Sequence, residues 1–153
     1  MKKLTKSAII RFAIGQLGWS TLSALVANWI ISFYQSDETM INEGQTIFVS
    51  QCRVILGIFT VLGGIYALGR IFAAFSAPLI GNMSDRCKSR RGRRLPFMKW
   101  SAIPFALVTV LIYCAPIDHE SSLNAVWVLV TILMFYLFMT LYCTPYNAFV
   151  AEM

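Results

Sequence analysis

Four long runs of apolar residues, separated by short charged stretches, constrain the fold of this chain more than any other feature. The runs cover approximately residues 12–34, 54–83, 97–114 and 123–150. A helix that crosses the hydrocarbon core of a bilayer needs about 20 mostly apolar residues, and each run is of this order. The pattern predicts an all-α, polytopic bundle of four transmembrane helices, with residues 1–153 forming one partial domain.

The composition also favours a membrane protein. Apolar types make up 58% of the chain and charged types 13%, against about 25% charged residues in soluble domains. The first apolar run follows several lysines, as the apolar region of a signal peptide does. It is longer than the ~7–15 residues of such a region, however, and continues through Trp29 and Phe33. We therefore expect a first membrane span.

Charge predicts the orientation of the spans. Residues 1–11 carry four basic residues and no acid, and residues 84–99 carry seven basic residues and one acid. The other two connections hold five acids and one basic residue. Because cytoplasmic loops collect Lys and Arg, both termini and the 84–96 loop should be cytoplasmic, in a plasma (inner) membrane. The same distribution accounts for the net charge of +6, so we expect no nucleic acid partner.

The sequence holds no pattern typical of a metal site, a cofactor site or an enzyme. Cys52, Cys87, Cys114 and Cys143 lack zinc-site spacing and favour free thiols, with a bridge between Cys52 and Cys114 as the less favoured alternative. Phosphate-binding glycine loops and nucleophile motifs are missing. We expect no cofactor, no metal and no catalysis.

Polar residues recur at helical spacing in two of the runs. The first run has Gln16, Ser20, Ala24 and Asn28, and the fourth has Tyr136, Thr140, Thr144 and Asn147. Such rows usually face a bundle interior or an aqueous cavity. Aromatic rings and amides suit a sugar, although interhelical hydrogen bonding without a ligand explains the rows equally well. The candidate substrate-binding residues are Gln16, Trp19, Ser20, Asn28, Tyr142 and Asn147.

The second run carries a different row and one unusual charge. Gly69, Ala73, Ala77 and Gly81 share a helical face and favour close helix packing. Arg70 lies near the middle of the run, where a guanidinium is costly unless it is paired. Because no Asp or Glu lies in any run, its partner should be a backbone carbonyl, an acid elsewhere in a longer protein, or an anionic ligand. Substrate binding by Arg70 is the less favoured hypothesis.

Three segments resemble one transporter family. The loop Gly81-Asn-Met-Ser-Asp-Arg-Cys-Lys-Ser-Arg-Arg-Gly-Arg-Arg-Leu-Pro-Phe97 is similar to the loop 2–3 signature of the major facilitator superfamily. Its extended form resembles the glycoside–pentoside–hexuronide (sugar/cation) symporters and the sucrose-transporter relatives. Gly15-Gln-Leu-Gly-Trp19 and Thr144-Pro-Tyr-Asn-Ala-Phe-Val-Ala-Glu152 agree with it. The resemblance implies the first four helices of a twelve-helix carrier.

The resemblance also implies a role for the loop after the second run. In the family, an Asp and an Arg of this loop help to latch the cytoplasmic side. A carboxylate near a helix end can bond arginines and a helix N-terminus. The implied gating residues are Gly81, Asp85, Arg86, Arg90, Gly92, Arg93 and Arg94.

The chain departs from the sodium-coupled members of that family. Those members carry acids in the second span, at positions that correspond here to Ala73 and Ala77. The first-span and fourth-span acids of melibiose-type carriers fall on Ser20 and Cys143. Because cations of this kind need oxygen ligands, we do not expect sodium coupling through these helices. Coupling to a proton through other helices, and uncoupled facilitation, both stay open.

The sequence therefore predicts secondary active or facilitative transport of a sugar-like or glycoside-like solute by alternating access. Four helices supply less than the two halves that enclose a transporter's substrate, so we expect a part of a longer chain whose remaining helices are missing here. The alternative is a small four-helix scaffold or assembly protein that acts as an oligomer.

Overall fold

The computed structural model describes residues 6–34, 48–49, 54–55, 59–87, 95–119 and 121–150. Four helices dominate it: α1 (Lys6–Tyr34), α3 (Val61–Arg86), α4 (Leu95–Ile112) and α5 (Ser122–Val150). Two short strands, β1 (Val54–Ile55) and β2 (Phe59–Thr60), pair antiparallel just before α3. The predicted all-α bundle of four helices is confirmed.

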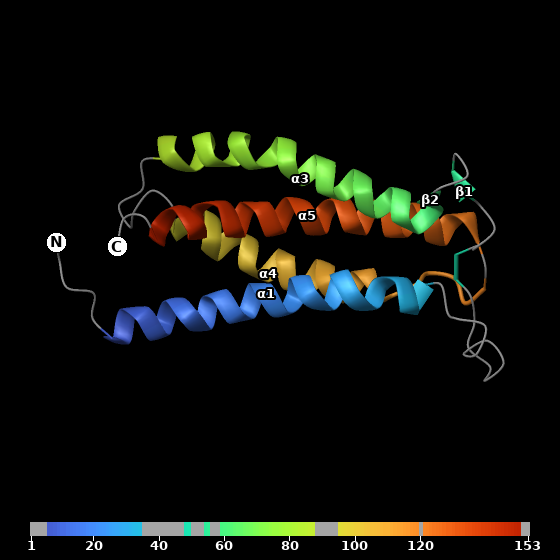
Figure 1. Cartoon of the computed structure of the whole chain (residues 1–153), viewed down its shortest axis with the longest axis horizontal. Coiled ribbons are helices and arrows are strands. Elements are labelled where there is room, and N and C mark those ends of the chain that lie inside the picture. The colour runs from blue at the N-terminus through green and yellow to red at the C-terminus, as the bar shows by residue number, and fades with distance from the viewer. Residues whose placement is uncertain are drawn as a thin grey trace.

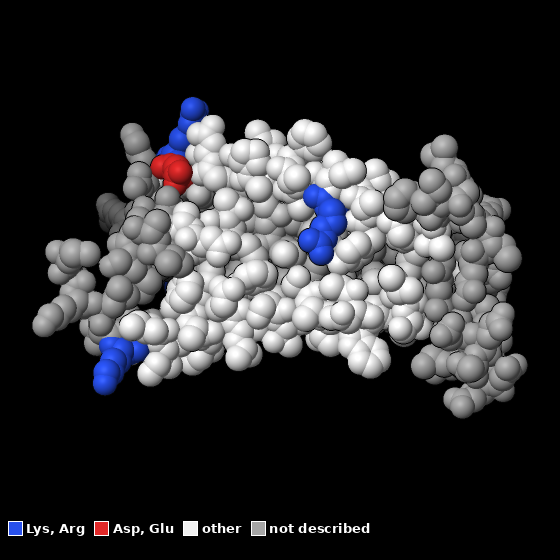
Figure 2. All heavy atoms as spheres, viewed as in Figure 1, with Lys and Arg blue, Asp and Glu red and all other residues white. Residues whose placement is uncertain are grey.

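The helices lie side by side along the long axis and alternate in direction (Figure 1). α5 packs along both α3 and α4, and α1 contacts α4 on the side away from α3. α1 begins, α3 ends, α4 begins and α5 ends at the same end of the bundle. Figure 2 shows that most of the visible face is uncharged, with charged side chains gathered mainly at this end.

The start of α3 differs from the predicted start of the second span at residue 54. The helix begins only at Val61, because Thr60 has an extended backbone and its side chain accepts a hydrogen bond from the Gly63 amide at 3.2 Å. Such a cap satisfies an amide that has no partner within the helix. The apolar run cannot reveal this boundary, because residues 54–60 are as apolar as the helix that follows.

Small residues let α3 approach α5 closely. Gly69 is buried, and a Cβ built on it would lie 2.5 Å from Cδ2 of Tyr136 and 2.8 Å from Cγ2 of Ile132. One end of the same row, Gly81, faces Thr144 of α5. The predicted packing role of this row is confirmed at both glycines.

The main apolar core lies toward the end of the bundle where α1 ends and α3 begins. Tyr34, Leu62, Ile112, Val128 and Ile132 are all nearly inaccessible there. Beside this core, the fully buried Asn124 donates from Nδ2 to the carbonyl oxygens of Phe48, Ile117 and His119, at 3.0–3.1 Å. These bonds join the connection after α4 to Phe48, which follows α1 in the chain.

The lateral surface is apolar. Leu17, Phe75, Trp100 and Ile103 each expose between 68% and 82% of their surface. Two helices, Val61–Arg86 and Ser122–Ala148, are long and apolar enough to cross a membrane by length and composition, and the apolar helix Pro96–Ile112 is shorter. The surface therefore suits contact with lipid hydrocarbon or with other helices.

Candidate functional site

A hollow of about 170 Å³ lies between α1, α4 and α5. It brings together two of the candidate substrate residues, Trp19 from α1 and Tyr142 from α5. Gly18 leaves room beside Trp19, since nothing lies within 4 Å of a Cβ built on it, whereas the Tyr146 ring fills the space beside Gly15, 3.1 Å from such a Cβ. The other lining residues are Leu22, Ala102 and Phe105.

Aromatic rings continue from the hollow along one side of the bundle. Tyr142 stacks between Phe105, with centroids 6.4 Å apart, and Tyr146, with centroids 5.7 Å apart. Tyr146 in turn stacks on Phe12 of α1, at 4.5 Å between centroids and 15° between planes. Because each ring is held by its neighbour, the Tyr142 ring is fixed in place beside the hollow before any ligand binds.

Tyrosine hydroxyls form hydrogen bonds that link α1 to the rest of the bundle on both sides of this hollow along the helix. Tyr146 donates to the carbonyl oxygen of Phe12, one turn before Gly15. Further along α1, Tyr113 donates to the carbonyl oxygen of Leu25 at 2.9 Å. At the end of α1, Tyr34 donates to the carbonyl oxygen of Ile112. The hollow therefore sits in the part of α1 that lies between two hydrogen-bonded attachments.

The predicted polar row of α1 bonds mostly within its own helix. The indole N–H of Trp19 donates to Oε1 of Gln16 at 3.2 Å, which orients both side chains. Ser20 donates to the carbonyl oxygen of Leu17, and exposed Asn28 donates to that of Ala24. Backbone carbonyls of the preceding turn are common partners for such side chains in membrane helices. These bonds replace the interhelical bonds weighed from the sequence.

The polar row of α5 divides between two neighbours. Tyr142 lines the hollow, whereas Tyr136 faces Gly69 and Thr144 faces Gly81 on α3. Asn147 is exposed and is not among the lining residues. A row at helical spacing covers a wide arc of the helix, so its members need not meet the same partner.

Arg70 lies over two aromatic rings, which were not predicted as its partners. Its guanidinium carbon lies 5.5 Å from the ring centre of Tyr66, one turn earlier on α3, and 5.9 Å from that of Tyr136 on α5. The sequence predicted a backbone carbonyl, an acid or an anionic ligand as the partner of this guanidinium. The structure instead places it over two aromatic rings, whose electron-rich faces can stabilise a cation. Arg70 is also exposed, and it lies outside the hollow.

The implied gating residues are described only in part. Gly81, Asp85 and Arg86 lie in the last turns of α3, with Asp85 and Arg86 exposed. Arg90, Gly92, Arg93 and Arg94 lie outside the described residues. A latch between them is therefore still a prediction.

Several lining residues were not predicted from the sequence. Leu22 of α1 and Ala102 and Phe105 of α4 had no polar signal. Gly15 and Gly18 were not named as candidates, although they belong to a segment singled out by resemblance. Within the described ranges, no group of three His, Cys, Asp or Glu side chains could hold a metal ion.

Comparison with known proteins decides the family. The model of the family described as MFS/sugar transport protein matches residues 11–153. The chain belongs to this family. Membership together with the apolar helices makes it an integral membrane protein, in a family of transporters rather than of enzymes.

Curated relatives agree with this membership. The putative glycoside/cation symporter YagG of Escherichia coli is 33% identical over 88 residues, or 58% of this chain and 19% of that protein. An uncharacterized symporter of Synechocystis is 39% identical over 105 residues, or 65% of this chain and 19% of that protein. The isoprimeverose transporter of Lactiplantibacillus pentosus is 35% identical over 71 residues, or 46% and 15%.

The chain thus spans about a fifth of the length of the curated relatives it matches. No solved structure gives a significant match.

Proposed function

We propose that this chain is part of a secondary transporter that carries a sugar-like or glycoside-like solute across the membrane by alternating access. The observation that carries the proposal is the hollow between α1, α4 and α5, which is lined by Trp19 and Tyr142. The family supports it, as do one relative named as a putative glycoside/cation symporter and another named as an isoprimeverose transporter. No contact in the described residues favours the scaffold alternative.

The lining chemistry suits a polar solute with apolar ring faces. The rings of Trp19 and Tyr142 offer flat surfaces for the C–H face of a sugar, and the Gln16 amide beside Trp19 offers a bond to a hydroxyl. At about 170 Å³ the hollow is small, so the substrate site is completed by helices of the longer carrier. Ser20, Asn28 and Asn147 act at its margin or toward those helices.

The attachments of α1 suit a change between two states. α1 is held by stacked rings, by single hydroxyl bonds from Tyr146, Tyr113 and Tyr34, and by the apolar packing of Val26 and Ile30 near its end. Bonds of this kind can break and reform as α1 tilts against α4 and α5, because each contributes only about 1 kcal/mol net. The solute would then be released on the opposite side of the membrane.

We infer that both termini and the 84–96 loop face the cytoplasm. The basic residues of segments 1–11 and 84–99 support this orientation. The alternating directions of the four helices put the start of α1 and the start of α4 at one end of the bundle, as the orientation requires. Asp85 and Arg86 would then belong to a latch on the cytoplasmic side.

The same helices favour coupling by something other than sodium. Ala73 packs against the apolar core of the bundle, and Ala77 and the buried Cys143 likewise bring no oxygen ligand. A sodium site needs several oxygens around one point. We propose that a proton acting through other helices, or no ion at all, accompanies the solute.

Uptake by the full-length carrier tests the transport proposal. We expect Trp19→Ala and Tyr142→Ala to lower uptake of a glycoside by about tenfold each, because each removes a stacking surface. Gln16→Ala and Ser20→Ala should have smaller effects. Exposed Asn28→Ala and Asn147→Ala should act only through the remaining helices.

Tyr142→Phe is the matched control, since it keeps the stacked ring and removes only the hydroxyl. Membrane expression of every variant is measured alongside. Wild-type uptake in all six alanine variants would contradict the assignment of these residues to the substrate site. Unchanged uptake in Arg70→Gln would exclude Arg70 from substrate binding. A defined oligomer of the 153-residue chain without any uptake would favour the scaffold instead.

A further inference from the structure

A second, larger hollow lies on the outer surface near the start of α4. Its volume is about 440 Å³, and the described residues that line it are Lys99, Trp100, Ile103 and Pro104. These residues are two adjacent pairs one turn apart on the same helix, so they present a single continuous face. The hollow shares no lining residue with the hollow beside Trp19.

The lining combines three chemical groups. Lys99 supplies an exposed ammonium group, while Trp100 and Ile103 are 82% and 70% exposed and form an apolar surface. Pro104 has no N–H, so the carbonyl oxygen of Trp100 lacks its usual donor one turn later in the helix. A cation, a carbonyl oxygen without its usual donor in the helix, and an apolar face thus lie close together on one side of α4.

This combination matches the chemistry of a phospholipid at a membrane surface. The Lys99 end of α4 is the end at which the bundle gathers its charge, and residues 84–99 hold seven basic residues against one acid. Tryptophan is enriched where hydrocarbon meets headgroups, and basic residues beside a span attract anionic lipids. The charge therefore selects an anionic lipid over a zwitterionic one.

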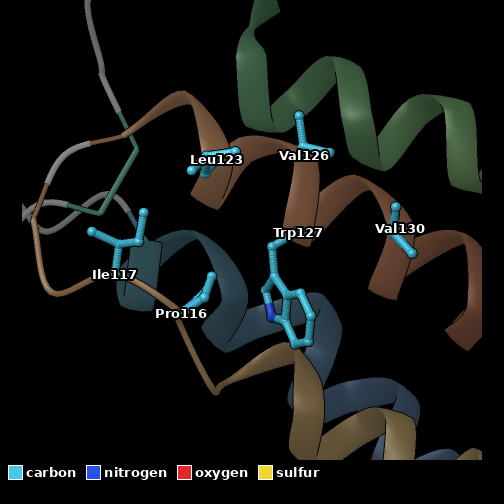
Figure 3. Close-up of a pocket in the computed structure, with 6 residues that line it drawn as sticks. All are labelled: Pro116, Ile117, Leu123, Val126, Trp127 and Val130. Atoms are coloured by element: carbon cyan, nitrogen blue, oxygen red, sulfur yellow. The ribbon is translucent and has the colours of Figure 1, made fainter.

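A hollow at the opposite end of the bundle provides a contrast. It measures about 380 Å³ and is lined by Pro116, Ile117, Leu123, Val126, Trp127 and Val130, as Figure 3 shows. None of the described residues that line it is charged, and the indole N–H of Trp127 already donates to the carbonyl oxygen of Leu111 at 3.2 Å. This hollow can therefore contact the acyl chains of a lipid, but its described residues provide no charge that would distinguish one headgroup from another.

We propose that the Lys99 hollow binds one anionic phospholipid, with the phosphate at the Lys99 ammonium and an acyl chain against Trp100 and Ile103. The headgroup of phosphatidylglycerol, which carries hydroxyls, can also donate to the carbonyl oxygen of Trp100. The lipid covers the most exposed tryptophan of the described surface and anchors the start of α4 at the membrane surface. The site is independent of the solute and of its coupling.

Fluorescence quenching by brominated lipids tests the proposal. The chain is placed in lipid nanodiscs of phosphatidylcholine that contain the same fraction of either brominated phosphatidylglycerol or brominated phosphatidylcholine. We expect the brominated anionic lipid to quench tryptophan emission more strongly, and Trp100→Phe to remove this difference. Lys99→Gln should lower the preference for the anionic lipid about fivefold, because it removes one basic residue at the surface, while quenching itself persists.

Two matched variants separate this site from general surface charge. Lys6→Gln removes another exposed basic residue at the start of α1, and Trp127→Phe removes the tryptophan of the uncharged hollow; both should keep the preference. Equal quenching by the two lipids, or a preference that survives Lys99→Gln, would overturn the proposal. If neither lipid quenches Trp100, the proposal is also wrong. In that case protein, such as a second copy of the chain, covers the Lys99 hollow.

Discussion

α5 packs against its two sides in different ways. Toward α3 it meets a glycine, with Tyr136 and Ile132 so close to Gly69 that no Cβ fits between them. Toward α1 it offers Tyr142 and Tyr146, which stack in a row and leave a hollow beside Trp19. The first contact leaves no space for a Cβ at Gly69. The second is looser: the Tyr146 ring lies 3.1 Å from a Cβ built on Gly15, and the other contacts are ring faces and single hydrogen bonds.

This difference indicates which parts of the bundle stay together. Small residues allow backbones to approach and gain dispersion along a whole helix face, which is the main attraction between helices in lipid. A stack or a hydroxyl bond contributes about 1 kcal/mol and can be exchanged for another. We therefore expect α3 and α5 to move as one unit, and α1 to be the helix that shifts beside the substrate.

The largest effect should come from the α3 contact. Gly69→Ala forces a Cβ against the Tyr136 ring and should lower the free energy of unfolding by about 2 kcal/mol through overpacking. Gly18→Ala is the matched control, because nothing lies within 4 Å of its added Cβ. It should leave stability unchanged or raise it slightly, since Ala is the better helix former. Thermal unfolding in detergent measures both, and equal losses would break the comparison.

A smaller effect should follow at the far end of α1. Tyr34→Phe removes the hydroxyl that bonds the Ile112 carbonyl, and both residues are fully buried. This carbonyl belongs to the last turn of α4 and has no partner within the helix, so stability should fall by about 1.5 kcal/mol. Tyr113→Phe, whose bond to Leu25 is exposed, serves as the control and should cost less. If the two variants unfold alike, burial does not set the strength of these attachments.

The smallest effect should come from the attachment near the start of α1. Tyr146→Phe keeps the stacks on Phe12 and Tyr142 and loses only the hydroxyl bond to the Phe12 carbonyl. We expect a loss of about 1 kcal/mol or less, measured by thermal unfolding in detergent, because a single hydrogen bond is removed and the ring contacts remain. If the loss of stability were as large as that of Gly69→Ala, the contacts of α5 with α1 and with α3 would be equally strong.

Much of the fold followed from local sequence. The four helices could be expected because hydrocarbon requires each spanning segment to satisfy its own backbone, and apolar runs of sufficient length leave the helix as the available form. The packing role of Gly69 and Gly81 followed from their spacing on one face. Trp19 and Tyr142 were named because they lie beside rows of polar residues at helical spacing, which usually face a bundle interior or a cavity.

The rest depended on which helix faces which, and that is not a local property. The partners of Arg70 are rings on α3 and α5, and no rule of spacing within one helix brings Tyr136 to it. Phe105 lines the hollow only because α4 lies against both α1 and α5. The sequence alone determined the helices, their order and the family, because these depend on hydropathy and motifs along the chain. Only the tertiary structure decided the hollow and its ring stack, because these depend on distances between residues more than a hundred positions apart.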